Sequence, residues 1–159
     1  MNIVDKVKQS INSNYKEVVN DYFTDVSDLV EGDVLDYGSG FGHILNYLRC
    51  YTSDIPHSGY DFICDYSILP NGKVNTNKKF NTITVLRNYI FYNDIKNFLH
   101  IFLYLKTLLH TDGKIIFGKH TPFDDYGDWN NQIGEWLENN CTKRGNYFYE
   151  YTNSSSTTS

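Results

Sequence analysis

Apolar residues along the chain follow two spacings, one typical of helices and the other typical of strands. Steps of three and four residues between apolar positions predict helices over residues 3–30, 43–51, 94–110 and 128–141. Short apolar runs between turn-forming residues predict strands over residues 33–37, 57–64, 80–90, 114–120 and 146–152. The helix of 94–110 has Asp94 as its expected N-cap, and the turn sequence HTDG is expected to end it.

The predicted strands and helices alternate along the chain. This alternation favours an α/β fold with a mostly parallel sheet and helices on both of its faces, which makes three layers. We expect a single domain over residues 1–152, because a chain of 159 residues has the length of one domain. The polar tail of 153–159 is low in complexity and is predicted to be disordered.

Three glycines stand at alternate positions directly after the first predicted strand. Gly38, Gly40 and Gly42 follow the apolar run DVLDY and precede a predicted helix, so they occupy a strand-to-helix turn. Glycine tolerates positive φ and lets a ligand lie directly on the backbone. The start of the following helix would add unpaired N–H groups suited to a carboxylate or a phosphate. The turn is also at the carboxyl end of a strand, where ligands of such sheets bind.

Two kinds of ligand suit a glycine turn of this type, a dinucleotide and S-adenosylmethionine. Dinucleotide sites favour the spacing G-x-G-x-x-G. The chain instead has G-x-G-x-G from Gly38 to Gly42, and Asp36 stands two residues before the first glycine. The spacing therefore favours S-adenosylmethionine and disfavours a nucleotide-dependent oxidoreductase.

The stretch VLDYGSGFGHILNYL resembles the first motif of class I S-adenosylmethionine-dependent methyltransferases, VLDxGxGxG followed by a helix. Three further segments resemble that family in the same order along the chain. They are SGYD at 58–61, FNTITVLRNYIFY at 80–92 and FLHIFLYLKTLLHTDGKIIFGKH at 98–120. The resemblance implies a Rossmann-like sheet of the methyltransferase type with S-adenosyl-L-methionine as its cofactor.

The resemblance also implies which residues hold the cofactor. The glycine turn, including Ser39, would bind its methionyl end, with Asp36 nearby. Asp61 would bind the ribose, because a carboxylate can accept hydrogen bonds from both hydroxyl groups. Asp65 would lie beside the adenine and Phe62 would flank it.

Arg87 and Asn88 end the fourth strand of the family pattern, so they would face the cofactor cleft. Each of these candidate residues also has a structural interpretation, as a turn residue, a helix cap or part of the core. His120, beside Lys119, is a weak candidate for a general base, because a lone histidine is more often structural. The acids and aromatics of 123–129 suit either a cationic substrate or a solvated loop. No catalytic residue and no metal site are predicted.

The chain departs from the family pattern in two places. The segment between Asp61 and Phe80 is too short for a full helix and a third strand, so the third-strand region is expected to be shortened. After residue 120 there is room for one helix and one strand, so we expect a truncated C-terminal end without the seventh strand. The aromatic strand 146–152 would then be an exposed edge, which a second copy of the chain or a partner protein would cover.

Composition limits the kind of partner and the compartment. The net charge of −5 makes nucleic acid an unlikely partner, because binding to phosphates depends on positive charge. Cys50, Cys64 and Cys141 are odd in number and lack C-x-x-C pairing, which favours free thiols in a reducing cytoplasm. The longest apolar region, 95–109, is too short and too polar to span a bilayer, and the N-terminus lacks an apolar signal core. We therefore expect a cytoplasmic protein without membrane contact.

Three functions follow from these observations. The leading one is methyl transfer from S-adenosylmethionine to a small molecule, a sugar or a protein. The second is a degenerate methyltransferase fold that only binds the cofactor or a partner protein. The third is a nucleotide-dependent oxidoreductase, which the glycine spacing disfavours. The same fold also hosts aminopropyl transfer, and the acids of 124–128 keep this reaction open. Methylation of DNA bases is disfavoured, because RNYIFY stands where the D/N-P-P-Y/F signature would follow the fourth family strand.

Overall fold

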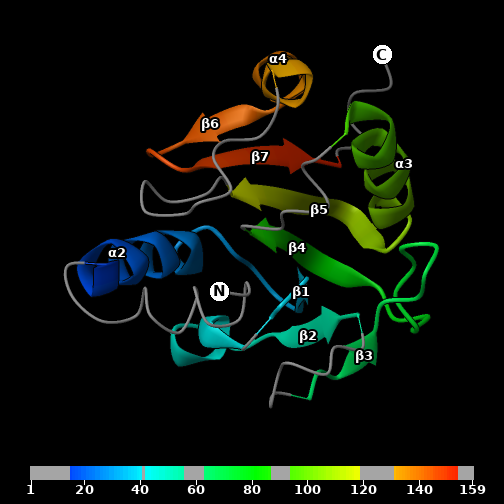
Figure 1. Ribbon diagram of the computed structural model, residues 1–159, viewed down its shortest axis with the longest axis horizontal. Coiled ribbons are helices and arrows are strands. Elements are labelled where there is room, and N and C mark those ends of the chain that lie inside the picture. The colour runs from blue at the N-terminus through cyan, green and yellow to red at the C-terminus, as the bar shows by residue number, and fades with distance from the viewer. Residues whose placement is uncertain (1–14, 41, 56–62, 87–93, 119–130, 154–159) are drawn as a thin grey trace, which may run out of the picture.

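The computed structural model describes residues 15–40, 42–55, 63–86, 94–118 and 131–153. These residues form a seven-stranded sheet with the strand order β3-β2-β1-β4-β5-β7-β6 (Figure 1). In that order the strands span Tyr66–Ser67, Tyr51–Asp54, Val34–Tyr37, Phe80–Leu86, Leu109–Gly118, Phe148–Thr152 and Thr142–Arg144. The strands from β3 to β5 pair in parallel, whereas β7 is antiparallel to both of its neighbours. The expected mostly parallel α/β sheet is confirmed.

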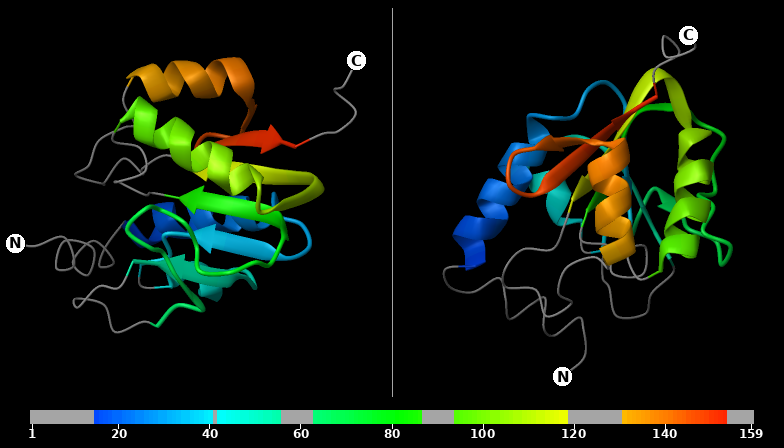
Figure 2. Two further views of the ribbon diagram at one scale, coloured as in Figure 1. Left: turned by 90° about the vertical axis from the view of Figure 1, so that its right-hand side faces the viewer. Right: turned by 90° about the horizontal axis from the view of Figure 1, so that it is seen from above.

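Helices cover both faces of this sheet (Figure 2). The helix α2 (Tyr15–Ser27) and the short 3₁₀ helix η1 (His43–Asn46) pack on one face, and α3 (Ile95–Lys106) and α4 (Asn131–Asn140) pack on the other. Alternate residues of a strand point to opposite faces. On β5, Phe117 accordingly joins the core under α3 and α4, and Ile116 joins the core under α2.

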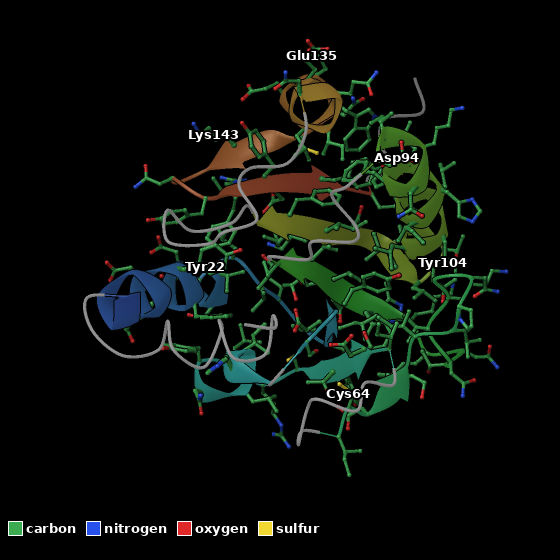
Figure 3. The ribbon with its side chains drawn as sticks, in the orientation of Figure 1. Tyr22, Cys64, Asp94, Tyr104, Glu135 and Lys143 are labelled. Carbon is green, nitrogen blue, oxygen red and sulfur yellow. The ribbon has the colours of Figure 1, made fainter. Side chains whose placement is uncertain are left out.

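The helix α3 begins where the sequence predicts. Asp94 is its N-cap, because the Asp94 side chain accepts a hydrogen bond from the backbone N–H of Asn97 at 3.3 Å. Asp94 and Tyr104 mark the two ends of this helix in Figure 3. The sequence HTDG, expected as the turn after the helix, lies inside β5. It interrupts the pairing of β5 with β4, and Asp112 has a φ of 65° there. Phe80 pairs with Leu109 before this interruption, and β4 resumes pairing at Lys114 after it.

The segment after the glycine turn differs from the expected helix over 43–51. The structure has only η1, and the chain is already extended in β2 at Tyr51, which pairs with Leu35 of β1. Three of the apolar residues that suggested a helix, Ile44, Tyr47 and Leu48, instead pack against α2, whereas Leu45 is exposed. Their spacing reflects contact with one neighbouring helix rather than a helix of their own.

The second strand lies earlier in the chain than the predicted 57–64. The structure places β2 at Tyr51–Asp54, and residues 56–62 are outside the described residues. The chain rejoins the sheet as β3, which has only two residues. The shortened third-strand region expected from the sequence is therefore confirmed. Of the N-terminal helix predicted over 3–30, the described part is α2.

The C-terminal end is short, but the prediction that only one strand follows residue 120 is wrong. Residues Thr142–Arg144 form β6, which pairs with β7, so β7 is an interior strand and not an exposed edge. The sequence TKR of β6 is too short and too polar to show a strand pattern. Its charged residues Lys143 and Arg144 are exposed, and edge strands with such residues resist pairing with other chains. The reason for expecting a second copy or a partner on β7 is therefore removed.

A chain of ion pairs fixes β6 to the rest of the sheet. Arg144 contacts Glu150 of β7 at 3.1 Å, and Lys114 of β5 contacts Glu150 at 3.6 Å and Glu31 at 3.3 Å. The side chain of Glu150 is only 10% exposed, so its charge lies between these two cations. The last two strands are thus held by both backbone pairing and charge.

Candidate functional site

The carboxyl ends of the parallel strands lie along one edge of the sheet. In the left view of Figure 2, β1 and β4 point toward this edge and β7 runs the opposite way. The edge includes Tyr37 at the end of β1 and Asp54 at the end of β2, and the glycine turn leaves β1 there. Ligands of open α/β sheets bind outside this edge.

The glycine turn has a backbone that only glycine adopts easily. Gly38, Gly40 and Gly42 have φ angles of 85°, 57° and 76°, in the left-handed region that costs other residues energy. The N–H groups of Gly38 and Ser39 donate to the Ser53 carbonyl at 2.9 and 2.8 Å, which ties the turn to β2. A Cβ atom built at Gly40 would meet no atom within 4 Å, so this part of the turn faces open space.

Asp36 lies under the turn and is 4% exposed. The Thr84 hydroxyl on β4 donates to its Oδ1 at 2.7 Å, while its backbone carbonyl accepts from the hydroxyls of Ser53 and Ser39 at 2.8 and 3.1 Å. Burial raises the pKa of Asp36 to about 6, against the opposing effect of the Thr84 and Ser39 hydroxyls, and the charge of Asp54 raises it further. A cation beside this carboxyl would favour its ionised form.

Asp54 is a site residue that the sequence interpretation missed. Its Oδ2 accepts a hydrogen bond from the Gly40 N–H at 2.7 Å, and its Oδ1 accepts one from the Ile55 N–H at 2.7 Å. Asp54 ends β2 directly beside β1, the place that the family resemblance gave to Asp61. One signal was present in the sequence, because the strand-forming run YTSD stops at an acid two residues before Pro56.

Asp65 closes a hydrogen-bonded ring with Thr52 of β2. Thr52 donates to Oδ2 of Asp65 from its N–H at 2.9 Å and from its hydroxyl at 3.1 Å, and the Asp65 N–H donates back to that hydroxyl at 3.0 Å. This ring fixes the chain where it rejoins the sheet. The predicted contact of Asp65 with adenine stays a prediction. Four other predicted site residues, Asp61, Phe62, Arg87 and Asn88, lie outside the described residues.

A cavity of about 290 Å³ opens next to Asp54, between the ends of β1 and β2 and the start of α3. Its lining is mainly apolar and includes Ile55, Ile68, Leu69, Pro70 and Ile101, with polar groups from Tyr37, Asp54, Asn71 and Asn97. The Tyr37 hydroxyl donates to the Gly72 carbonyl at 2.7 Å and so holds one wall in place. Burial raises the pKa of Tyr37, which keeps this hydroxyl a donor. An apolar cavity with a few polar groups suits a flat ring system.

Thiol and metal chemistry have little support in the described part of the chain. Burial raises the pKa of Cys64 (Figure 3) to about 11 and that of Cys141 to about 12, and it raises the pKa of Cys50 as well. Thiols of this kind are protonated and weakly nucleophilic at neutral pH. Within the described ranges, no group of three His, Cys, Asp or Glu side chains is placed to hold a metal ion.

A helix must be long and apolar to cross a membrane. Among the residues that the structure describes, every helix is too short or too polar to do so.

Solved structures of methyltransferases resemble this fold. The N-methyltransferase NodS of Bradyrhizobium japonicum WM9, solved with S-adenosyl-L-homocysteine, has a TM-score of 0.58 and 11% identity over 96% of this chain and 99% of that chain. The chain has the class I methyltransferase fold. This confirms the fold that the sequence resemblance implied.

Two further structures show the same likeness. A putative O-methyltransferase of Nostoc punctiforme has a TM-score of 0.58 and 13% identity over 86% of this chain, which spans 57% of that protein. An S-adenosylmethionine-dependent methyltransferase of Clostridium acetobutylicum has a TM-score of 0.51 and 17% identity over 93% of this chain and 68% of its own. No protein-family model matches the sequence, and no curated protein matches it significantly.

Proposed function

We propose that the chain binds S-adenosyl-L-methionine at the carboxyl edge of β1 and β2 and transfers its methyl group to an acceptor. One observation carries the proposal. The positive-φ glycine turn faces open space at Gly40 and lies directly beside a cavity lined by the acid that ends β2. The turn suits the amino-acid end of the cofactor, and the cavity suits its nucleoside.

The charges of the site agree with this placement. The methionyl end of the cofactor carries an ammonium and a sulfonium besides its carboxylate. Burial raises the pKa of Asp36 under the turn to about 6, and a cationic group of the ligand placed beside it would favour its ionised form. We assign the backbone of Gly38, Ser39, Gly40 and Gly42 to the methionyl end. Asp61 remains the candidate for the ribose hydroxyls, and Asp54, which lines the cavity, is a second candidate.

We assign the adenine to the cavity, with its apolar wall of Ile68, Leu69 and Ile101. Phe62, Asp65, Arg87 and Asn88 are retained as contacts that the family resemblance implies.

Held by the glycine turn beside Asp36, S-adenosyl-L-methionine would supply a methyl group made electrophilic by its sulfonium. A lone pair of the acceptor would form the new bond to this methyl carbon, and the electrons of the carbon–sulfur bond would stay on sulfur. The chain's own residues need mainly to hold the two reactants in line. Proximity and orientation of this kind supply on the order of 7–11 kcal/mol. The glycine turn would fix one reactant, and the ends of β4 and β5 would border the other. A proton leaving a hydroxyl or ammonium acceptor requires a base, and none is assigned.

The class of acceptor is proposed only as a small molecule, a sugar or a protein. NodS is named as an N-methyltransferase and the Nostoc protein as a putative O-methyltransferase, so their names do not favour nitrogen over oxygen as the acceptor atom. We also propose a cytoplasmic location, because unpaired thiols at Cys50, Cys64 and Cys141 suit a reducing compartment.

A second candidate function is a cofactor-binding module without turnover. The observation that favours it is the loss of the helix after the glycine turn, which is reduced to the single 3₁₀ turn of η1. A helix there would have presented several N–H groups and a partial positive charge to the ligand. Without it, the backbone of the turn has fewer donors to offer.

Calorimetric titration with S-adenosylmethionine, S-adenosylhomocysteine and NAD tests the proposal. Binding of the first two and not of NAD is the expected result, and binding of NAD alone would contradict it. Release of S-adenosylhomocysteine in the presence of amine, hydroxyl and protein acceptors then distinguishes an enzyme from a binding module. Binding without release across all acceptors would favour the module.

A further inference from the structure

We infer that the Asp54 carboxylate accepts the hydrogen bond of the Gly40 N–H in the free protein, and that the carboxylate of an incoming ligand replaces Asp54 as the acceptor. The inference rests on the proposed function, because it concerns the same glycine turn. It adds a competing group within the site, which makes the affinity for a ligand depend on whether that ligand carries a carboxylate.

The first step is an inventory of the backbone donors that the structure describes in the turn. The N–H groups of Gly38 and Ser39 donate to the Ser53 carbonyl, and the N–H of Gly42 donates to the Ser39 carbonyl at 2.9 Å. These acceptors are backbone atoms that hold the turn to β2 and to itself. Gly40 differs from these three, because its N–H donates to a side chain, the Oδ2 atom of Asp54, at 2.7 Å.

The second step is that this bond is short and replaceable. A distance of 2.7 Å is typical of an N–H group that donates to an ionised oxygen. A side chain can rotate away without disturbing the β1–β2 ladder, whereas the Ser53 carbonyl cannot. Gly40 also faces open space, with no atom within 4 Å of a Cβ built there, so a ligand group has room to approach.

The third step concerns where Asp54 would go. Asp54 already lines the cavity next to the turn, together with Tyr37 and Asn71. A rotation that moves Oδ2 away from the Gly40 N–H would keep the charge at the cavity wall, on the side where Oδ1 accepts from the Ile55 N–H at 2.7 Å. A ligand carboxylate would exchange one carboxylate for another at the Gly40 N–H, and the site would lose no hydrogen bond at that atom.

The consequence is that the displacement of Asp54 lowers the affinity only for ligands that carry a carboxylate. Such a ligand must displace Asp54 before its carboxylate can accept from the Gly40 N–H. In the native chain it should therefore bind only slightly more tightly than a decarboxylated analogue. Removing the Asp54 carboxylate should increase the difference in affinity between the two ligands. The relevant quantity is the ratio of two dissociation constants, that of decarboxylated S-adenosylhomocysteine divided by that of S-adenosylhomocysteine.

The test compares this ratio in the wild-type chain, in Asp54→Ala and in Asp54→Asn. Both ligands keep the ribose and the adenine, so any ribose contact of Asp54 cancels in the ratio. Asp54→Ala should raise the ratio about tenfold, the low end for a hydrogen bond to a charged group. Asp54→Asn should raise it less, because the Asn side chain lacks the charge and still has an oxygen that can accept from Gly40.

An unchanged ratio in Asp54→Ala would overturn the inference. An equal rise in both variants would overturn it as well, because charge alone would then explain the effect. A wild-type chain that binds neither ligand would instead refute the proposed function, and the inference with it.

If Asp54→Ala fails to fold, the wild-type chain provides a second measurement by NMR. The Gly40 amide resonance should shift strongly with S-adenosylhomocysteine and little with the decarboxylated analogue. Equal shifts with the two ligands would contradict the exchange.

Discussion

The Thr84 hydroxyl on β4 donates a hydrogen bond of 2.7 Å to Oδ1 of Asp36 on β1, directly beneath the glycine turn. This bond joins two neighbouring parallel strands through side chains that are both buried. It holds a carboxyl group in an environment where burial raises its pKa to about 6. The chain thus keeps an acid in its interior that titrates close to neutral pH, and the first two predictions depend on it.

The first prediction concerns stability against pH. The folded pKa of Asp36 is about 6, above its ordinary value of 3.8, so the folded state holds the proton more tightly than the unfolded state does. The stability that this group contributes is therefore fully present below about pH 4 and is lost as the pH rises through about 6. The loss is about 3 kcal/mol at 1.36 kcal/mol per pKa unit. Asp36→Asn should remove this dependence.

Urea unfolding at several pH values checks the first prediction. The difference in the free energy of unfolding between Asp36→Asn and the wild type should grow in favour of the variant between pH 4 and pH 7. Contributions from groups remote from Asp36 are the same in both proteins and cancel in the difference. Parallel stability curves would show that Asp36 does not titrate in this range.

The second prediction concerns proton release on cofactor binding. A cationic ligand beside Asp36 would lower its pKa from about 6, so binding near pH 6 should release part of a proton. Affinity should accordingly rise with pH between about 5 and 7. Calorimetry at pH 6 in two buffers of different ionisation enthalpy measures the release directly. Binding enthalpies that agree in both buffers would argue against a cation at this position.

The third prediction separates ligand contact from backbone strain in the glycine turn. Gly40 and Gly145 have φ angles of 57° and 63°, and a Cβ at either position meets no atom within 4 Å. Gly145 lies on the turn between β6 and β7, and the strands β4 and β5 separate these two strands from β1. Gly40→Ala and Gly145→Ala should therefore each cost about 1–2 kcal/mol of stability, from the left-handed backbone alone.

Only Gly40→Ala should weaken S-adenosylhomocysteine, because its methyl group enters the space that the ligand needs. Titration of both variants, with melting curves as the measure of folding, checks this difference. Equal affinity in the two variants would mean that the turn does not touch the ligand.

The fourth prediction concerns the ribose. If Asp61 accepts hydrogen bonds from the two hydroxyl groups, Asp61→Ala should weaken S-adenosylhomocysteine by about 1.5–3 kcal/mol. The loss should nearly vanish for an analogue without the two hydroxyls. A similar loss for both ligands would remove Asp61 from this role and leave Asp54 as the acid at the ribose.

The fifth prediction concerns the edge strand β6. Lys143 is exposed on this edge, and a charged residue there discourages pairing with another chain. Lys143→Val should promote association at high protein concentration, as measured by light scattering. Lys96→Val on the exposed surface of α3 makes the same change away from a strand edge and should have no such effect. If both variants associate alike, general hydrophobicity rather than the edge is responsible.

The parts of the fold with a clear pattern could be predicted from the sequence. The glycine turn, the cap at Asp94 and the apolar run of β4 each have a local signal that the tertiary structure does not override. Tyr51 shows why the next segment could not be predicted in the same way. It follows Ile44 and Leu48 at helical steps, yet it begins β2, because pairing with Leu35 outweighs local spacing.

The glycine turn of the site could be predicted from the sequence. Asp54 could not, because its place in the site depends on where β2 ends in the sheet. Asp54 reaches the Gly40 N–H only because β2 ends there, and the end of a four-residue strand leaves almost no pattern in a sequence. The strand β6 shows the same limit at the other edge of the sheet. Its three residues are all exposed, so no alternation of burial marks them as a strand.

The antiparallel position of β7 has a consequence for synthesis of the chain. β5 carries Ile115, Ile116 and Phe117, all fully buried in the finished sheet, and one of its edges pairs only with β7. Residues 148–152 leave the ribosome later than residues 109–118, by a few seconds at about 5–20 residues per second. During that interval one edge of β5 would have unpaired backbone groups, and its apolar side chains would lack part of their final cover. We expect this stage to be when the protein most needs a chaperone, and when slowed translation between α4 and β7 would most readily lead to aggregation.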